Sequence, residues 1–472
     1  MIEQLKPYPE YRQSSLPWLP QVPTGWDVAR NGSLFGQRNE TGYEELPVLE
    51  VSIRTGVRVR DFERSKRKQV MSDARKYKRA VQGDVAYNMM RMWQGAVGVA
   101  PVAGLVSPAY VVARPYAGVE PRFFVSLFRT SEYLFEIDSS SRGIVKDRNR
   151  LYWDQFKQML SPVPPPEDQA AIVRFLDWAN ARLERAIRAK RKVIALLNEQ
   201  KQAIIHRAVT RGLDPSVSLK PSGIPWLGDI PQHWEVVRLK HCISPVAQGW
   251  SPQCDAQPAE KDEWGVLKVG CVNKEVFSPD QNKKLPPVLQ PDQDLEVRDG
   301  DILVSRANTR ELLGLAALVE NPPAKRILSD KLFRFRARND SFSSKFIVYT
   351  LRSKPSREQI ESSTNGASSS MQNIGQDVLK NLWVSMPSIA EQQRIVESVA
   401  LATHPCNVGI SRLEREIKLL REYRTRLVAD VVTGKLDVRE AASHLPDEAP
   451  PDAEEETEVS DEIEAVDEEA IA

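Results

Sequence analysis

The sequence predicts an α+β protein in which two similar α/β domains are separated by two long antiparallel helices that form a coiled coil, with a pseudo-twofold internal repeat. Two blocks of sequence each occur twice, each copy closes with a long amphipathic stretch, and the segments between mix short apolar runs with helix-like stretches. At 472 residues the chain is too long for one ordinary core, so at least two domains are expected.

The first repeated block recurs at an offset of 208 residues. Eight of the seventeen positions from 14 to 30 are identical to those from 222 to 238, and two of the eight are tryptophans, Trp18 and Trp26, which recur as Trp226 and Trp234. Identity at a fixed offset is typical of a duplicated unit. The motif "SGIPWLGDIPQHWEVVRLK" at 222–240 is therefore a second beginning in the middle of the chain.

Divergent segments follow each beginning, at about 31–159 and 239–382, and they share little except the dipeptides Gly83-Asp84 and Gly300-Asp301. Mixed strand-like and helix-like stretches of this kind favour an α+β fold. The predicted strands are Leu46–Ile53, Tyr110–Ala113, Gly300–Ser305 and Lys331–Arg336, and the predicted helices are Phe123–Phe135 and Ser344–Leu351.

A second repeated block, beginning at Pro164 and again at Pro387, closes each copy at an offset of 223 residues. Its first copy predicts a helix, because a proline run precedes acidic Glu167 and Asp168, apolar residues recur at three- and four-residue steps, and Gly212 ends the pattern. More than forty residues at 1.5 Å each give a rod of roughly 60 Å. Such a stripe needs a partner of similar length.

The second copy of this block is the expected partner, although Pro405 and Gly409 predict a kink or a break near His404. Antiparallel pairing would place the two domains at opposite ends of the rod; two ordinary core helices are the alternative. The expected boundaries are 1–163 for the first domain, 164–212 for the first long helix, 213–386 for the second domain, 387–437 for the second long helix and 438–472 for an acidic disordered tail.

The charge of the chain is unevenly distributed. Residues 447–472 hold thirteen acidic groups and no basic one, which leaves 65 Lys and Arg against 51 acids in residues 1–446. A basic body suits a polyanionic partner such as nucleic acid. The tail itself is either a solubilising end or, alternatively, an extension that mimics DNA or binds a partner.

Each Gly-Asp dipeptide leads into a predicted strand that ends in polar and basic residues, and a small polar loop precedes each long helix. Such side chains bind base edges or phosphates, whereas an ordinary surface turn is the alternative for either loop. The basic run at 64–79 is also a candidate for phosphate binding. The predicted DNA-contact residues are Asn88, Arg91, Trp93, Gln94, Arg142, Lys146, Arg148, Arg306, Asn308, Arg310, Ser369, Gln372 and Asn373.

Motifs for catalysis are missing from the sequence. We find no GxGxxG, GxxxxGK[ST], HExxH or GxSxG motif, and the segment Asn321-Pro322-Pro323-Ala324 lacks the aromatic residue that an adenine methyltransferase stacks on its flipped base. The spacing of His233, His241, Cys242 and Cys254 matches no standard zinc pattern. No apolar run reaches the length of a membrane span and the N-terminus is charged, so a cytoplasmic location is expected, without a membrane partner.

Taken together, the start motif, the Gly-Asp strands, the helix openings "PPPEDQAAIV" and "PSIAEQQRIV" and the duplicated long helices resemble the specificity subunit of type I restriction-modification systems, over nearly the whole chain to about residue 440. The first helix opens with Pro-Pro-Glu-Asp-Gln where this family usually has Pro-Pro-x-x-Glu-Gln, and the tail is not part of the family pattern. The resemblance implies a non-catalytic subunit with two target recognition domains, each for one half of a bipartite site in double-stranded DNA.

The resemblance also implies partners and cofactors. Two methyltransferase subunits would dock on the long helices and bring S-adenosylmethionine, and restriction subunits would join for translocation and cleavage with ATP and Mg²⁺, so no cofactor is expected in this chain. Two alternatives stay open: a stand-alone sequence-specific DNA-binding protein without catalytic partners, and an enzyme in its own right, either a methyltransferase or a nuclease. Co-purification with methyltransferase chains separates the first alternative, and assays with labelled S-adenosylmethionine or magnesium test the second.

Overall fold

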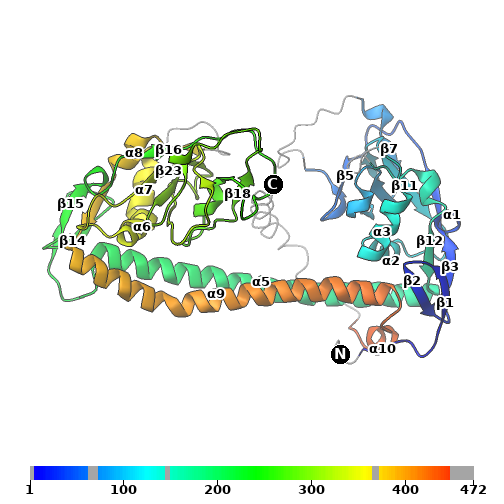
Figure 1. The fold of residues 1–472 in the computed structure, drawn as a ribbon. Helices are drawn as coiled ribbons and strands as arrows, with labels where there is room; N and C mark the ends of the chain where they lie inside the picture. The colour runs from blue at the N-terminus through cyan, green and yellow to red at the C-terminus, as the bar shows by residue number, and fades with distance from the viewer. Residues whose placement is uncertain (1–4, 62–72, 144–148, 364–371, 447–472) are drawn as a thin grey trace. The chain divides into compact units, whose positions relative to one another are not determined.

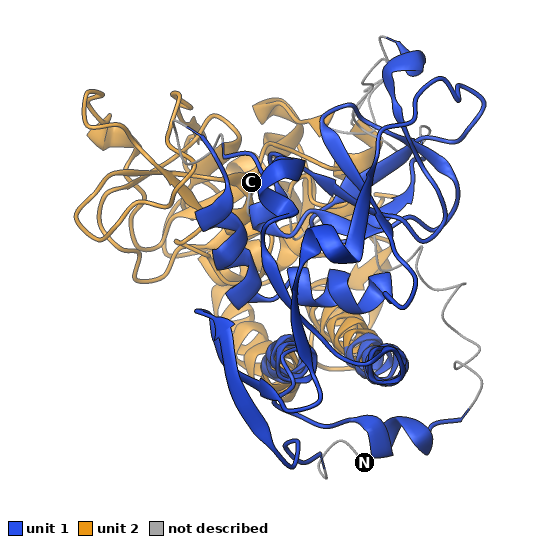
Figure 2. Cartoon of the chain, turned by 90° about the vertical axis from the view of Figure 1, so that its right-hand side faces the viewer, with its two compact units in different colours: residues 1–190, 415–454 blue, residues 191–414, 455–472 orange. Residues whose placement is uncertain are grey.

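The computed structural model describes residues 5–61, 73–143, 149–363 and 372–446 (Figure 1). The described residues divide into two compact units: unit 1 contains those up to 190 and from 415 to 446, and unit 2 contains those from 191 to 414 (Figure 2). Each unit combines small β-sheets with helices, so the predicted α+β class is confirmed.

Unit 1 is built around a four-stranded sheet with the order β4-β11-β8-β9, and its other strands form two-stranded pairs. The strands of unit 1 are β1 (Tyr11–Leu16), β2 (Leu19–Pro23), β3 (Asp27–Arg30), β4 (Phe35–Arg38), β5 (Leu49–Ser52), β6 (Gly56–Val59), β7 (Lys78–Ala80), β8 (Val85–Asn88), β9 (Val97–Val99), β10 (Gly104–Val106), β11 (Tyr110–Pro115) and β12 (Leu160–Val163). Its shorter helices are α1 (Asn31–Leu34), η2 (Ala74–Lys76), η3 (Met92–Gln94), α2 (Pro121–Phe128), α3 (Ser131–Ser140), α4 (Trp153–Phe156) and α10 (Arg439–Ser443).

Unit 2 also contains a four-stranded sheet, with the order β16-β23-β19-β21, beside a three-stranded sheet, β18-β17-β22. The strands of unit 2 are β13 (Leu219–Pro221), β14 (Asp229–Pro231), β15 (Glu235–Arg238), β16 (Ala247–Gln248), β17 (Gly265–Leu267), β18 (Asn282–Lys284), β19 (Ile302–Ser305), β20 (Ala307–Asn308), β21 (Ala316–Leu318), β22 (Arg326–Ile327), β23 (Leu332–Phe335), β24 (Gln372–Asn373) and β25 (Trp383–Met386). Its shorter helices are η5 (Leu239–His241), η6 (Val269–Val272), η7 (Gln293–Leu295), α6 (Ser344–Arg352), α7 (Lys354–Ser363) and α8 (Gln376–Lys380).

Strand registers agree between the units at the positions that the sequence repeats. Asp27 lies opposite Val163 where β3 pairs with β12, and Glu235 lies opposite Met386 where β15 pairs with β25. The repeated tryptophans Trp26 and Trp234 are fully buried beside these pairs, each in the core of its own unit. Large buried aromatic side chains contribute strongly to core stability, which accounts for their presence in both copies of the start motif.

Two long helices, α5 (Pro166–Arg211) and α9 (Ile389–Val432), each contribute one segment to unit 1 and one to unit 2. Figure 2 shows their unit 1 segments end on and side by side. As predicted, α5 starts at a proline followed by Glu167 and Asp168, whose charges favour the positive end of the helix dipole. It ends at Arg211, directly before Gly212, which has a φ of +73° that glycine tolerates best.

The two long helices run antiparallel within each unit. In unit 1, Glu184 pairs with Arg424, and Lys190 pairs with Glu416 at 2.6 Å. In unit 2, the Nζ of Lys201 donates to the Oδ1 of Asn407 at 2.7 Å. The Cβ that a side chain at Gly409 would add lies 3.3 Å from a methyl carbon of Leu197. In both units, residues with higher numbers on α5 therefore contact residues with lower numbers on α9, as antiparallel helices require.

Three features differ from the sequence prediction. Helix α9 continues through Pro405 without a break, since residues 389–432 form one helix. The predicted helix Phe123–Phe135 is two helices, because α2 ends at Phe128 and Thr130 caps the start of α3 by accepting a hydrogen bond from the Tyr133 amide. Residues 438–446, expected to begin a disordered tail, instead contain α10 and bury Val438 and Leu445 in unit 1. The acidic residues 447–472 lie outside the described residues.

Candidate nucleic-acid interface

In unit 1, the Gly83-Asp84 turn precedes the strand that carries the first predicted contact residues. Gly83 adopts a φ of +89°, a conformation that favours glycine. The buried carboxylate of Asp84 accepts hydrogen bonds from the Val81 amide (2.8 Å) and from Nε of Arg38 (2.7 Å). Because a satisfied buried carboxylate is held from two sides, strand β8 begins at a rigid turn.

At the other end of β8, the predicted contact residues are of two kinds. Asn88 is buried and its Oδ1 accepts a hydrogen bond from the Met90 amide at 3.0 Å, while Nε1 of Trp93 donates to the Met90 carbonyl at 3.1 Å. These two side chains shape the turn that joins β8 to β9. Arg91 and Gln94 are exposed on the same turn, so their side chains are accessible to a ligand.

The loop between α3 and α4, which α4 and β12 separate from α5, lies against this turn. The Leu151 amide donates to the Met89 carbonyl at 2.9 Å, and Arg142 and Arg150 exchange two backbone hydrogen bonds of 3.0 Å. Arg142 is exposed. The structure thus brings Arg142 together with the turn at 89–95, although the two are about fifty residues apart in sequence. The predicted contact residues Lys146 and Arg148 lie outside the described residues.

Unit 2 has the same turn at Gly300-Asp301. Gly300 has a φ of +81°, and the carboxylate of buried Asp301 accepts hydrogen bonds from the Arg298 amide (2.8 Å) and from Nε of Arg336 (2.6 Å). Strand β19 follows this turn as β8 follows the first one. The shared dipeptide therefore marks one local structure in both divergent segments.

The segment before α8, which α8 and β25 separate from α9, also returns to the end of its strand. The Ile374 amide donates to the Arg306 carbonyl at 3.0 Å, and strand β24 pairs with β20 so that Gln372 lies opposite Asn308. Asn373, next to Gln372, lies opposite Ala307. Four of the predicted residues are therefore adjacent in unit 2. The predicted contact residue Ser369 lies outside the described residues.

Several of these side chains already have partners in the protein. Arg306 is half-buried and its Nη1 donates to the Asp330 carbonyl at 3.3 Å, and exposed Arg310 forms an ion pair with Glu361 at 3.4 Å. Nδ2 of Asn308 donates to Oδ1 of Asn273 at 3.4 Å. Weak or exposed contacts of this kind are readily exchanged for contacts to a ligand.

Sequence reasoning missed Asn273, because its segment has no counterpart in the first copy.

Sequence reasoning also assigned Gln169 and Gln392 only to the long helices. Both are buried; each side chain donates to a carbonyl before its helix, Pro164 at 2.8 Å and Pro387 at 2.9 Å. The Oε1 of Gln169 accepts a hydrogen bond from the Glu120 amide at 2.8 Å, and the Oε1 of Gln392 accepts one from the Ser343 amide at 2.9 Å. Their recurrence at the 223-residue offset was the available signal, and it indicates a fixed joint between each long helix and the segment before α2 or α6.

The basic run at 64–79 is described only from Asp73 onward. In that part, Asp73 forms ion pairs with Arg75 at 3.1 Å and Lys76 at 3.8 Å, and Arg79 pairs with Glu40 at 3.1 Å. Nζ of Lys78 donates to a backbone carbonyl at 2.7 Å, and burial lowers the pKa of this lysine. The described end of the run is thus largely engaged within unit 1.

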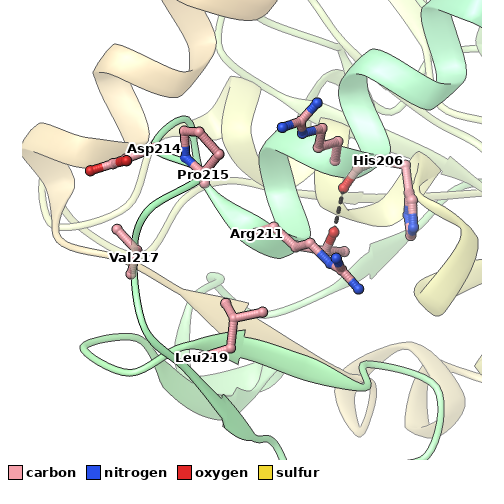
Figure 3. A pocket seen from close by; sticks show the side chains of 9 residues that line it. His206, Arg211, Asp214, Pro215, Val217 and Leu219 are labelled. Carbon is pink, nitrogen blue, oxygen red and sulfur yellow. Dashed lines mark hydrogen bonds between the residues drawn. The ribbon is translucent and has the colours of Figure 1, made fainter.

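A cavity of about 370 Å³ lies in unit 2 where α5 ends (Figure 3). It is lined by His206, Arg207, Thr210, Arg211, Gly212, Asp214, Pro215, Val217 and Leu219. Burial, together with the charges of Lys354 and Arg211, lowers the pKa of His206. The Asp214 carboxylate accepts hydrogen bonds from the Ser216 amide at 2.8 Å and hydroxyl at 2.6 Å. Arg207 and Arg211 give this cavity a basic lining. The Asp214 carboxylate is bonded to Ser216, so it does not form a catalytic pair with His206.

No cluster of three metal-ligating side chains occurs within the described ranges. Cys242 and Cys271 are buried, and burial raises the pKa of Cys242 to about 11, so both thiols are unreactive near neutral pH. None of the described helices combines the length and apolar character of a membrane span.

Comparison with known proteins supplies relatives of this chain. It is 34% identical over 187 residues to the type I restriction enzyme EcoEI specificity subunit of Escherichia coli, a match that covers 39% of this chain and 32% of that protein. It is 24% identical over 294 residues to the MjaVIII specificity subunit of Methanocaldococcus jannaschii, covering 60% of this chain and 64% of that one. The matches thus span about one third and just under two thirds of these relatives. No protein-family model matches the chain.

A solved structure supports the fold. A chain from a study of complex assembly and conformational transition of the type I R-M system aligns with a TM-score of 0.56 at 17% identity, covering 88% of this chain and 99% of that one. At this identity the likeness concerns the fold alone.

Proposed function

We propose that this chain, a homologue of type I restriction enzyme specificity subunits, is the DNA sequence-recognition subunit of a type I restriction-modification complex. It binds a bipartite target in double-stranded DNA through two recognition domains, residues 1–163 and 213–386, and performs no catalysis itself. The absence of the common catalytic motifs from its sequence is in keeping with this role.

One observation carries the proposal. In each unit, the segment before the short helix and strand that lead to the long helix is hydrogen-bonded to the end of the strand that follows the Gly-Asp turn, through Leu151 to Met89 and through Ile374 to Arg306. These two hydrogen bonds join positions that correspond under the sequence offsets of 217 between the Gly-Asp turns and 223 between the helix blocks. Two segments rich in Arg, Asn and Gln are therefore joined in the same way twice.

The chemistry of these side chains suits recognition of bases in the major groove. An arginine such as Arg91 or Arg306 can donate two hydrogen bonds to guanine, and Asn or Gln can bind adenine through N6 and N7. Other basic side chains, such as Arg142, would contact phosphates and fix the register. Because the two sets of side chains differ, the two domains read different half-sites.

The long helices hold the recognition domains apart as a coiled coil, and the two halves of the chain form a pseudo-twofold repeat. Antiparallel ion pairs such as Lys190 with Glu416, and the shared strand registers, support this arrangement. Two methyltransferase subunits dock on the helices, where Leu196, Leu401 and Leu419 are exposed. These partners bring S-adenosylmethionine, and restriction subunits bring ATP and Mg²⁺ chemistry. As a partner of such subunits, the protein acts in the cytoplasm.

The experiment that tests the proposal maps methylated adenines in a genome that expresses this chain with its methyltransferase partner. We expect every methylated site to contain two unlike half-sites at one fixed spacing. Co-purification should recover two methyltransferase chains for each copy of this chain. A chain that binds specific DNA but recovers no such partner would instead be a stand-alone DNA-binding protein.

A further inference from the structure

Two arginines occupy corresponding places in the two units, at the C-terminal end of the helix that follows the central sheet. Arg129 is the C-terminal cap of α2, and Arg352 is the last residue of α6. The residue after each is a buried hydroxyl: Thr130 donates to the Leu127 carbonyl at 2.7 Å, and Ser353 donates to the Thr350 carbonyl at 2.6 Å. The two arginines therefore correspond at the offset of 223 residues, although sequence reasoning singled out neither.

Both guanidinium groups bind backbone carbonyl oxygens in the divergent part of their own unit. Nη2 of Arg129 donates to the carbonyls of Ile53 and Arg54, the latter at 3.0 Å, in the turn between β5 and β6. Nη1 of Arg352 donates to the Val272 and Lys274 carbonyls, both at 3.2 Å, and Nη2 donates to the Asn273 carbonyl at 3.1 Å, where η6 ends.

Each arginine also lies against the turn that carries predicted contact residues. A Cβ added to Gly95, which closes the turn of Arg91 and Gln94, would lie 4.0 Å from Nε of Arg129. Nη1 of Arg352 donates at 2.8 Å to the carbonyl of Ala316, where the chain returns to the sheet after Arg306 and Asn308. In unit 2 the guanidinium of Arg352 therefore links a divergent turn to the end of the turn that follows the Gly-Asp strand by hydrogen bonds, and in unit 1 Arg129 binds a divergent turn and lies beside the corresponding contact turn.

The chemistry of this link does not depend on the side chains of the divergent turn. Among the described residues, neither guanidinium forms an ion pair with a carboxylate, and burial lowers the pKa of both, that of Arg352 to about 10. Both side chains are half-buried, and the charge of Glu275 partly offsets the effect of burial on the pKa of Arg352. Removing a cation from water is costly, so the hydrogen bonds of each guanidinium and its position at a helix C-terminus compensate. Carbonyl oxygens are present whatever the sequence of the turn. An arginine at this position of the helix can thus hold turns of unrelated sequence.

We infer that Arg129 and Arg352 are positioning residues for DNA recognition, each fixing the divergent turn and the contact turn of its own domain in one geometry. In unit 2 the link reaches a predicted contact side chain, because the Asn273 that Arg352 holds accepts a hydrogen bond from Asn308. This inference rests on the proposed function. It adds that recognition of one half-site depends on Arg129 and recognition of the other depends on Arg352.

The test compares Arg129→Gln and Arg352→Gln in the complete complex with its methyltransferase partner. Binding is measured on the duplex mapped from the methylated genome and on duplexes in which one half-site or the other is scrambled. We expect each variant to lose about tenfold of the discrimination at one half-site and to keep the other within about twofold, with the two variants affecting opposite half-sites. The matched controls are Arg122→Gln and Lys354→Gln, exposed cations near the same helices.

A second measurement is independent of DNA. Amide hydrogen exchange should become faster at 53–56 in the Arg129 variant and at 272–275 in the Arg352 variant, while the central strands β8 and β19 keep their protection. Lysine variants, which retain the charge but not the fork of donors, should show a smaller effect of the same kind. If a glutamine variant fails to fold, its lysine variant is compared with the wild type in both measurements.

The outcomes separate the inference from the proposed function. If both variants weaken both half-sites equally, or neither half-site changes, the positioning role is wrong even though the chain reads DNA. If the wild-type complex shows no sequence-specific binding, the proposed function is wrong. Independently of DNA binding, unchanged amide hydrogen exchange at 53–56 and 272–275 would show that the two arginines do not hold these turns.

Discussion

At the scale of single residues, the sequence patterns predicted which turns carry polar and basic side chains, but not which of these side chains are engaged within the protein. Asn88 has the side-chain type that binds adenine, yet the structure buries it and uses its Oδ1 to hold the Met90 amide. A pattern of residue types cannot distinguish a side chain that shapes a turn from one that projects from it. The Arg129 and Arg352 links were not predictable either, because their acceptors are carbonyls about eighty residues away in sequence.

Arg306 is the residue whose substitution should change recognition most directly. Among the residues that the structure describes, its guanidinium forms one weak hydrogen bond, to the Asp330 carbonyl, so Arg306→Ala removes little from the described fold. We expect affinity for one half-site to fall by about 1 to 3 kcal/mol while the other half-site is unaffected. Fluorescence anisotropy of the complex on duplexes with single-base changes measures this loss. Lys240→Ala, at an exposed position in the same unit, serves as the control, and equal losses for both variants would argue against a specific contact.

His206 makes the stability of unit 2 depend on pH. Burial lowers its pKa in the folded protein, and the positive charges of Lys354 and Arg211 lower it further, although Glu358 acts in the opposite direction. The unfolded chain therefore binds more protons than the folded one as pH falls below about 6.5, and stability decreases. Urea unfolding at pH 7.5 and 5.5 should show a smaller decrease for His206→Gln than for the wild type. An identical decrease in both would show that the histidine does not contribute.

At the scale of secondary-structure elements, long periodic patterns were predicted well and short boundaries were not. Helix α5 begins at Pro166, where the proline run and acidic first turn place it, since these signals act locally. The division between α2 and α3 depends on one cap at Thr130, which an apolar pattern running through Phe135 conceals. Residues 438–446 were grouped with the acidic tail by composition, but Val438 and Leu445 find apolar partners that only the fold supplies.

Pro405 tests how strongly packing supports helix α9. Proline removes one backbone hydrogen bond and clashes with the preceding turn, yet buried Thr403 and Cys406 on either side pack within unit 2 and the helix continues. Pro405→Ala should therefore raise the free energy of unfolding of unit 2 by about 1 to 3 kcal/mol. Chemical unfolding followed by circular dichroism measures this change. Ala402→Gly, which should destabilise the same helix by about 1 kcal/mol, provides a control of opposite sign.

At the scale of the whole molecule, the repeats in the sequence predicted that similar parts would occur twice, and the matching strand orders of the central sheets agree with this expectation. The bases that each domain binds could not be predicted, because direct readout depends on the geometry of turns whose sequences have diverged. The duplicated parts are defined by local hydrogen bonds and core packing, which short motifs encode well. The divergent parts depend on contacts between distant segments.

The proposed coiled coil predicts a strict spacing between the half-sites. One inserted base pair moves the half-sites apart by about 3.4 Å and rotates one of them about the DNA axis. If the spacer is rigid, contacting both half-sites then requires deforming the DNA, which costs binding free energy. We expect duplexes with one base pair added to or removed from the spacer to bind at least about tenfold more weakly. Competition binding with the wild-type duplex as reference measures this. Equal affinity across three adjacent spacings would indicate a flexible connection between the domains.

The agreement in register between β3 with β12 and β15 with β25 has an evolutionary consequence. Because Asp27 meets Val163 just as Glu235 meets Met386, both divergent segments leave and re-enter the scaffold at equivalent backbone positions. Recombination at these junctions could replace one segment by the other, or by one from a related gene, without altering the hydrogen bonds on either side. Under the proposed function, such an exchange would give a new DNA specificity in a single genetic event and leave the proposed partner subunits unchanged.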